Sequence, residues 1–292
     1  MKDGVLLTAH GSVETLDELP AFLARIRRGR PAPKELVDEV TRRYRRIGGS
    51  PLLETTREVA RLLELELDAP VAVGMRLSRP EIGDALAELR SRGVTRVLSL
   101  PLAPQSVHVY HAAVREAAAG AEVVEVAPWG QEPLLIAALS AKIDDAAQQL
   151  SPARRADAPL VLTAHSLPVR AIQAGDPYEA QLRAMCASLT SARSESRRTT
   201  VCFQSQGFDG GEWLGPDVAT TLRELAAAGA TEVLVSAVGF LAEHVETLYD
   251  LDVEAQELAA GLGLRLVRAR CLDADPALIR ALSAVARRAL AR

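Results

Sequence analysis

The chain has 292 residues, of which 48% are hydrophobic, and a formal net charge of −4 at pH 7. This mildly acidic balance does not favour nucleic acid as a partner. No apolar run approaches the roughly 20 residues that a transmembrane helix needs, and the N-terminal apolar stretch is too short for a signal peptide core. We therefore expect a globular, cytoplasmic protein without a transmembrane segment.

The first half of the chain alternates apolar runs with helical patterns. Residues 5–12 read VLLTAHGS, an apolar run closed by turn-forming residues, which is typical of a buried parallel strand that ends in a functional loop. Helices are predicted over 14–29, 34–49, 51–67, 79–93, 106–118 and 132–150, and further strands over 70–77, 94–104 and 121–129. Gly11 lets the backbone after the first strand turn sharply or approach a ligand.

Arginines are concentrated in the first two predicted helices. Eight of them lie between Arg25 and Arg46. They could be solvated side chains near helix ends, where positive charge interacts favourably with the C-terminal end of the helix dipole. Alternatively, some of them meet ligand carboxylates, which the planar guanidinium group pairs with two hydrogen bonds.

The second half continues the alternation. Strands are predicted over 159–168, 199–206, 231–240 and 264–272, and helices over 179–189, 217–229, 241–263 and 275–292. The polar segment 151–159 is the predicted boundary between the two halves.

Two pairs of segments indicate an internal repeat. VLLTAHGS matches LVLTAHSL at 160–167, so His10 and His165 both follow or end strands. GVTRVL and GATEVL each follow a helical pattern and precede a histidine by ten residues, at His108 and His244. We therefore predict a duplicated α/β unit, with ligands bound at the carboxyl ends of the strands.

The repeat predicts two similar α/β lobes, each a parallel sheet flanked by helices. The expected lobes are residues 1–155 and 156–292, and the final helix (about 275–291) could pack back on the first lobe. His108 and His111, three residues apart on a predicted helix, could bind a metal, but two histidines alone are weak evidence.

Carboxylates are regularly spaced in the predicted helix over 241–263. Glu246, Asp250 and Glu254 recur every four residues, which places them on one helical face. This face could be an ordinary solvated one. Alternatively, because it begins beside His244 and beyond a strand end, it could attract and pass a divalent cation, for which imidazole and carboxylate are suitable ligands and bases.

Several segments, in order along the whole chain, resemble those of the ferrochelatase family. They are RRGRP, RYRRIGGSPL, TAHSLP, GDPY with Gln181, FQS with WLGPDV, and GF followed by HVETLYDLD. The resemblance implies two Rossmann-like lobes with a porphyrin cleft between them. It also implies a lyase-type metal chelatase that inserts Fe²⁺ into a porphyrin in haem biosynthesis, with porphyrin and ferrous iron as substrates.

The resemblance also implies roles for individual residues. His165 and Glu246 would be the catalytic pair and would contact the metal. Asp250 and Glu254, with Arg43 nearby, would form an outer divalent-metal site. The expected porphyrin contacts are His10, Gly11, Ser12, Arg27, Arg28, Arg43, Ser166 and Trp213. His10 stands where many bacterial relatives have a tyrosine over the porphyrin centre, so it is expected to ligate iron axially; the alternative is a hydrogen-bonded loop histidine.

No tightly bound cofactor is expected. The three cysteines, Cys186, Cys202 and Cys271, are too few and too scattered for an iron–sulfur cluster. The arginines and the low aromatic content favour coproporphyrin III over protoporphyrin IX. The alternatives are a sirohydrochlorin-type cobalt or nickel chelatase and a non-catalytic haem or porphyrin carrier. We expect a monomer that could make transient contact with the next haem-pathway enzyme.

Overall fold

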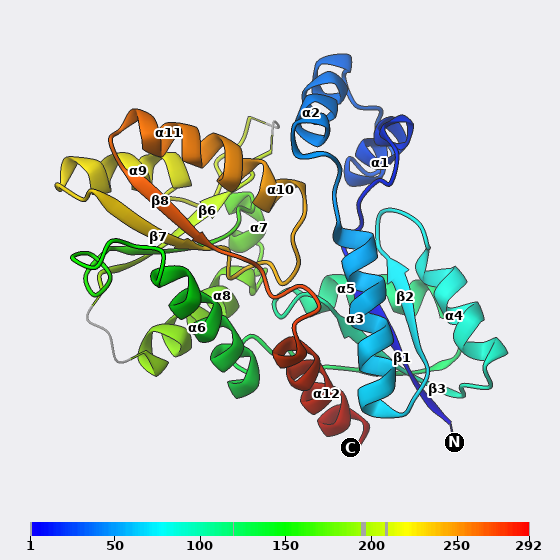
Figure 1. Cartoon of the computed structure of the whole chain (residues 1–292). Helices are drawn as coiled ribbons and strands as arrows, with labels where there is room; N and C mark the ends of the chain where they lie inside the picture. The colour runs from blue at the N-terminus through cyan, green and yellow to red at the C-terminus, as the bar shows by residue number, and fades with distance from the viewer. Residues whose placement is uncertain (1, 119, 194–196, 208–209, 292) are drawn as a thin grey trace. The chain divides into compact units, whose positions relative to one another are not determined.

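The computed structural model contains two parallel β-sheets of four strands each (Figure 1). It describes residues 2–118, 120–193, 197–207 and 210–291. Among the described helices, none is both long and apolar enough to cross a membrane.

The first sheet is built from the N-terminal half of the chain. Its strands are β1 (Asp3–Ala9), β2 (Val71–Met75), β3 (Arg96–Pro101) and β4 (Glu122–Glu125), in the order β2-β1-β3-β4. The helical elements around it are η1 (Leu16–Glu18), α1 (Leu19–Ile26), α2 (Lys34–Ile47), α3 (Leu52–Leu67), α4 (Ile82–Ser91) and α5 (Val107–Ala117). Six consecutive residues of β1 are buried, as expected for a central parallel strand with helices on both faces.

The second sheet repeats this plan. Its strands are β5 (Leu160–His165), β6 (Thr199–Gln204), β7 (Glu232–Ser236) and β8 (Arg265–Ala269), in the order β6-β5-β7-β8. The remaining helices are α6 (Pro133–Ala147), α7 (Val169–Gln173), α8 (Tyr178–Ala192), α9 (Val218–Ala227), α10 (Val245–Leu248), the π-helix η2 (Asp250–Ala255), α11 (Gln256–Gly261) and α12 (Pro276–Leu290).

The two sheets have the same strand order, which confirms the predicted duplication of an α/β unit. The repeated Thr-Ala-His phrase occupies the same place in each, on the central strands β1 and β5. His10 directly follows β1, and His165 is the last residue of β5. Both histidines therefore stand at the carboxyl edge of a parallel sheet, where such folds bind ligands.

Local signals explain several helix ends. Pro133 and Pro276 lie at the start of α6 and α12, where a fixed φ and a missing N–H cost nothing. Asp217 accepts a hydrogen bond from the Thr220 amide at 2.6 Å and so caps α9. Gly48, at φ +78°, ends α2 in the left-handed conformation.

The chain forms two compact units that are not continuous in sequence. The first contains residues 1–129, 242–245 and 273–292, and the second contains 130–241 and 246–272. The boundary expected after residue 155 differs from this division. Helix α6, which precedes it, packs on α8, β7 and β8 of the second unit, while α12 packs on α3 in the first.

The segment 241–263 differs from the single helix that its sequence predicts. It contains the short α10, then the π-helix η2, then α11. The Glu254 amide donates to the Tyr249 carbonyl five residues back, at 3.0 Å. Because π-helical turns are rare and occur mostly at functional sites, this interruption draws attention to the carboxylates around it.

Candidate active site

His165 has a defined tautomer. Its Nδ1 atom is hydrogen-bonded to the backbone carbonyl of Ser166. Because a carbonyl oxygen only accepts, Nδ1 holds the proton, and the lone pair of the neutral ring is on Nε2. Nε2 lies 3.6 Å from the Glu246 carboxylate, and the two side chains are 36% and 28% exposed. A base and a carboxylate, both reachable by a ligand, therefore stand together at this strand end.

The backbone around His165 is held by hydrogen bonds from three directions. The Tyr178 hydroxyl donates to the His165 carbonyl at 2.8 Å. The Ser166 amide donates to the Gln204 backbone carbonyl at 2.8 Å, and the Ser166 hydroxyl donates to the Leu214 backbone carbonyl at 2.9 Å. Ser166, expected to contact a porphyrin, has a fully buried side chain. In this structure its hydroxyl bonds to the loop backbone at the Leu214 carbonyl.

The three carboxylates of the predicted face have different surroundings. Glu246, on α10, lies beside His165. The Asp250 carboxylate accepts a hydrogen bond from the Ser205 hydroxyl, whereas Glu254 is exposed. No group of three or more His, Cys, Asp or Glu side chains within the described ranges is arranged to hold a metal ion. The outer metal site therefore stays a prediction.

An ion pair fixes the π-helix to the sheet. Arg268, on β8, donates to both carboxylate oxygens of Asp252, and its side chain is only 2% exposed. Arg270 approaches the same carboxylate at 3.1 Å. Because the guanidinium group donates to both oxygens in a bidentate arrangement, the contact has a defined orientation as well as opposite charges. It links the element that follows Glu246 to the neighbouring strand.

The first unit contains the repeat-equivalent strand end. His10 is exposed, and the Gly11 backbone has φ +110°. A Cβ at Gly11 would lie 2.7 Å from the Ser78 hydroxyl oxygen, so glycine is required here by both conformation and space. The Ser12 hydroxyl is buried against Tyr44, with the two oxygens 3.0 Å apart. His10 thus projects from a tightly constrained loop.

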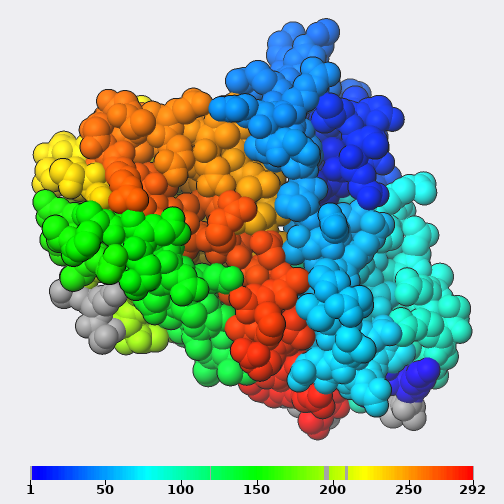
Figure 2. All heavy atoms as spheres, viewed as in Figure 1, coloured from blue at the N-terminus to red at the C-terminus, as the bar shows by residue number. Residues whose placement is uncertain are grey.

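The arginines expected to contact a porphyrin also lie in the first unit. Arg27 caps α1, and Arg28 follows it with φ +57°. Arg43 lies on α2, which is visible at the surface in Figure 2 and whose residues are exposed or half-buried except for the buried Tyr44. The Arg43 Nε donates to Glu39 at 2.8 Å. Hydrogen bonds from Arg43 and Arg42 lower the pKa of Glu39, so part of the positive charge of α2 is neutralised locally.

His108 and His111 do not share a ligand-binding arrangement. His111 is buried, with Nδ1 2.8 Å from the Ser99 hydroxyl and Nε2 2.9 Å from the Val126 carbonyl. Burial lowers its pKa. His108 is exposed on the same helix. Because both ring nitrogens of His111 are engaged, its role is structural.

Trp213, another expected porphyrin contact, lies in the second unit and is half-buried. Its ring packs so closely on Gly207 that a Cβ there would lie 2.6 Å from Cζ2. The indole therefore packs on the loop that follows β6. Strand β6 pairs with β5, which ends at His165.

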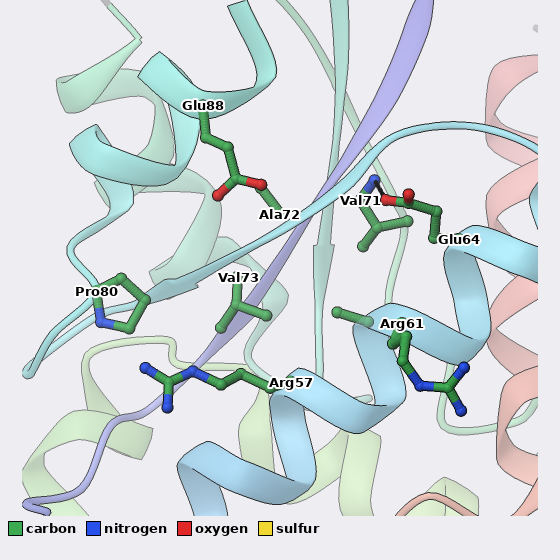
Figure 3. Close-up of a pocket in the computed structure, with 9 residues that line it drawn as sticks. Arg57, Arg61, Glu64, Val71, Ala72, Val73, Pro80 and Glu88 are labelled. Carbon is green, nitrogen blue, oxygen red and sulfur yellow. Dashed lines mark hydrogen bonds between the residues drawn. The ribbon is translucent and has the colours of Figure 1, made fainter. Parts of the chain in front are cut away.

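Among the hollows lined by described residues of the first unit, two differ in whether they include residues of the predicted site. One, of about 200 Å³, includes Ser12, Arg25 and Arg79 in its lining. The other, of about 460 Å³, lies along the sheet edge at β2 and is lined by charged side chains of α3 and α4 (Figure 3). None of the predicted site residues lines the second hollow.

Sequence reasoning missed Gln204 and Arg268, whose side chains bond to the segment that contains Glu246. The FQS segment at 203–205 contained the available signal for Gln204, because a glutamine at a buried strand end needs partners for its amide. Nothing local in sequence marks Arg268, whose partner lies 16 residues earlier.

Two solved structures share this duplicated parallel fold. The chain has a TM-score of 0.63 to SirB from Bacillus subtilis with Fe³⁺, covering 99% of this chain and 96% of that one at 15% identity. A second structure, the sirohydrochlorin chelatase SirB from the subspecies spizizenii in complex with cobalt, has a TM-score of 0.58, with coverage of 99% and 95%. At 15% identity these likenesses show the fold alone.

The family follows from sequence. The ferrochelatase family model matches residues 2–290. A ferrochelatase of Acidobacterium capsulatum is 35% identical, over 99% of this chain and 94% of that protein. A coproporphyrin III ferrochelatase of Geobacillus thermodenitrificans is 33% identical, over 99% and 96%. The chain belongs to the ferrochelatase family, and is a metal chelatase of haem biosynthesis that acts on porphyrin and iron.

Proposed function

We propose that this enzyme inserts Fe²⁺ into coproporphyrin III in preference to protoporphyrin IX, with His165 and Glu246 as the catalytic pair. The observation that supports the pair is the 3.6 Å approach of the His165 Nε2 to the Glu246 carboxylate. The fixed Nδ1 proton leaves the Nε2 lone pair directed toward ligands.

The reaction replaces two pyrrole N–H protons with one Fe²⁺ ion, so each turnover releases two protons. The neutral His165 Nε2 accepts one pyrrole proton, and the Glu246 carboxylate stabilises the imidazolium that forms. The imidazolium then releases this proton to water, which leaves Nε2 free to accept the second pyrrole proton in the same way. Glu246 and the neutral form of His165 are also suitable transient ligands for the entering iron, so His165 either accepts a pyrrole proton or ligates the metal at any one moment. Binding that favours a macrocycle whose nitrogens tilt toward these groups would lower the barrier.

The preference for the more acidic porphyrin has two supports. Coproporphyrin III has four propionates and protoporphyrin IX has two, and Arg27, Arg28 and Arg43 can pair with carboxylates. In addition, a relative named coproporphyrin III ferrochelatase is 33% identical to the chain. The contacts expected for His10 and Trp213 belong to the same proposal.

We also propose that no iron–sulfur cluster takes part. All three cysteines are buried. Burial raises the pKa of Cys186 and of Cys202 to about 12, which opposes the thiolate form that metal ligation needs. The cytoplasmic location, the monomeric state and a transient contact with the next pathway enzyme stay predictions.

The test is an anaerobic assay of the purified protein with Fe²⁺ and either porphyrin, followed by the loss of free-porphyrin fluorescence. We expect many turnovers with coproporphyrin III and few with protoporphyrin IX. The reverse preference would overturn the substrate proposal but leave iron insertion standing. Tight binding of metallated porphyrin without turnover would favour a carrier, and turnover of sirohydrochlorin with cobalt or nickel alone would favour the other chelatase class.

A further inference from the structure

Gln204 joins the two segments that contain the catalytic pair. It is the last residue of β6, opposite His165 in the strand register, and is 4% exposed. Its amide oxygen accepts a hydrogen bond from the Thr163 hydroxyl at 2.7 Å, and its amide nitrogen donates to the Glu246 backbone carbonyl at 2.7 Å. Thr163 lies two residues before His165, so both project from the same face of β5.

The chemistry of the two partners requires an amide at this position. The Glu246 carbonyl can only accept, so it needs a donor, and the Thr163 hydroxyl directs its proton to an acceptor. Among side chains of this length, glutamine supplies both groups, whereas an ionised glutamate supplies no donor. We propose that Gln204 is a positioning residue for metal insertion, which holds the Glu246 backbone at a fixed distance from His165.

The next residue strengthens the connection. Ser205 has φ +60°, a left-handed conformation that is strained for a residue other than glycine. Its hydroxyl donates to the Asp250 carboxylate, one helical turn beyond Glu246. Two consecutive side chains at the end of β6 thus bond to the segment 246–250. Strain of this kind persists where the surrounding structure fixes it.

The internal repeat shows that the fold does not require this hydrogen-bond network. Thr8 occupies the place of Thr163 in the first unit, and its fully buried hydroxyl has no hydrogen-bond partner among the described residues. In the first unit Ala9 pairs with Met75, as Ala164 pairs with Phe203 in the second, so Arg76 occupies the place of Gln204. Arg76 is exposed. The threonine is therefore common to both units, while its glutamine partner occurs in the unit that contains Glu246.

The test replaces Gln204 with Met, which has a similar length but no amide. This inference rests on the proposed function, so wild-type turnover with Fe²⁺ and coproporphyrin III is measured first. We expect Gln204→Met to lower kcat about 10- to 100-fold, because small displacements of reacting groups have effects of that size. The porphyrin KM should stay within about 3-fold, since the amide is buried away from the ligand.

Gln256→Met is the matched control. Gln256 lies in the same unit and also donates its amide to a backbone carbonyl, that of Leu266 at 3.1 Å. The kcat of Gln256→Met should equal that of the wild type. Its loss of thermal stability should be similar to that of Gln204→Met. If Gln204→Met does not fold, Thr163→Val, which removes the hydrogen bond on the other side of the amide, should lower kcat in the same direction.

A folded Gln204→Met with kcat within 2-fold of wild type, or an equal loss in Gln256→Met, would overturn the inference. A Thr163→Val variant with wild-type kcat would do the same where Gln204→Met fails to fold. These outcomes leave the proposed function intact. An inactive wild type would overturn the proposed function itself.

Discussion

At the scale of single residues, the hydrogen bonds of a histidine ring distinguish a chemical role from a structural one. His165 has one nitrogen bonded to a backbone carbonyl and the other turned toward Glu246. His111 has both nitrogens engaged in the interior. The sequence placed His165 at a strand end and His111 on a helix beside His108, and the resemblance to a family singled out His165. The ring contacts could not be predicted, because they depend on Ser99 and Val126, 12 and 15 residues away.

His111 should make stability depend on pH. Burial lowers its pKa below the ordinary value of 6.5, so the unfolded chain binds a proton more readily than the folded one. The free energy of unfolding is therefore unaffected by this group above about pH 6.5 and falls as the pH drops below it, by at most about 1.4 kcal/mol per pH unit. Urea unfolding at pH 7.5 and 5.5 measures this fall, and His111→Gln should reduce it. An equal pH dependence in both proteins would contradict the assignment.

At the scale of elements, the strands follow closely from the apolar runs, whereas the segment 241–263 does not. Its spacing of four indicates one α-helix, but the structure inserts a π-helix between α10 and α11. The cause lies outside the segment: Arg268 holds Asp252, and Gln204 and Ser205 hold residues 246 and 250. A local periodicity contains no information about these partners.

Removing the charge of Asp252 should destabilise this element. Arg268 is almost fully buried, and Asp252→Asn leaves its charge without a carboxylate, at a cost of about 3 kcal/mol in the free energy of unfolding. Denaturant unfolding of the whole protein provides the measurement. Asp157→Asn is the matched control, because Asp157 pairs with Arg154 while both are exposed, and such pairs contribute little. Equal losses of unfolding free energy in the two variants would contradict a stabilising role for the ion pair between Asp252 and Arg268.

At the scale of the whole molecule, the duplication could be predicted because both copies retain the Thr-Ala-His phrase and the strand order that follows. The unit boundaries could not. The polar stretch 151–159 suggested a linker, but the chain changes unit at residues 129–130, beside the buried Trp129, and returns to the first unit at 242–245 and again at 273. Discontinuous units depend on packing between distant segments, which composition does not reveal.

The two strand-end histidines of the repeat allow the most direct test of the account. Turnover of Fe²⁺ with coproporphyrin III would be compared for wild type, His165→Ala and His10→Ala, with thermal unfolding as the check on folding. His165→Ala should lower kcat at least about 100-fold, the lower range for loss of a catalytic base, while His10→Ala, which removes the expected axial ligand, should retain more activity. A folded His165→Ala protein with near wild-type turnover would contradict the assignment of the reaction to the His165–Glu246 pair.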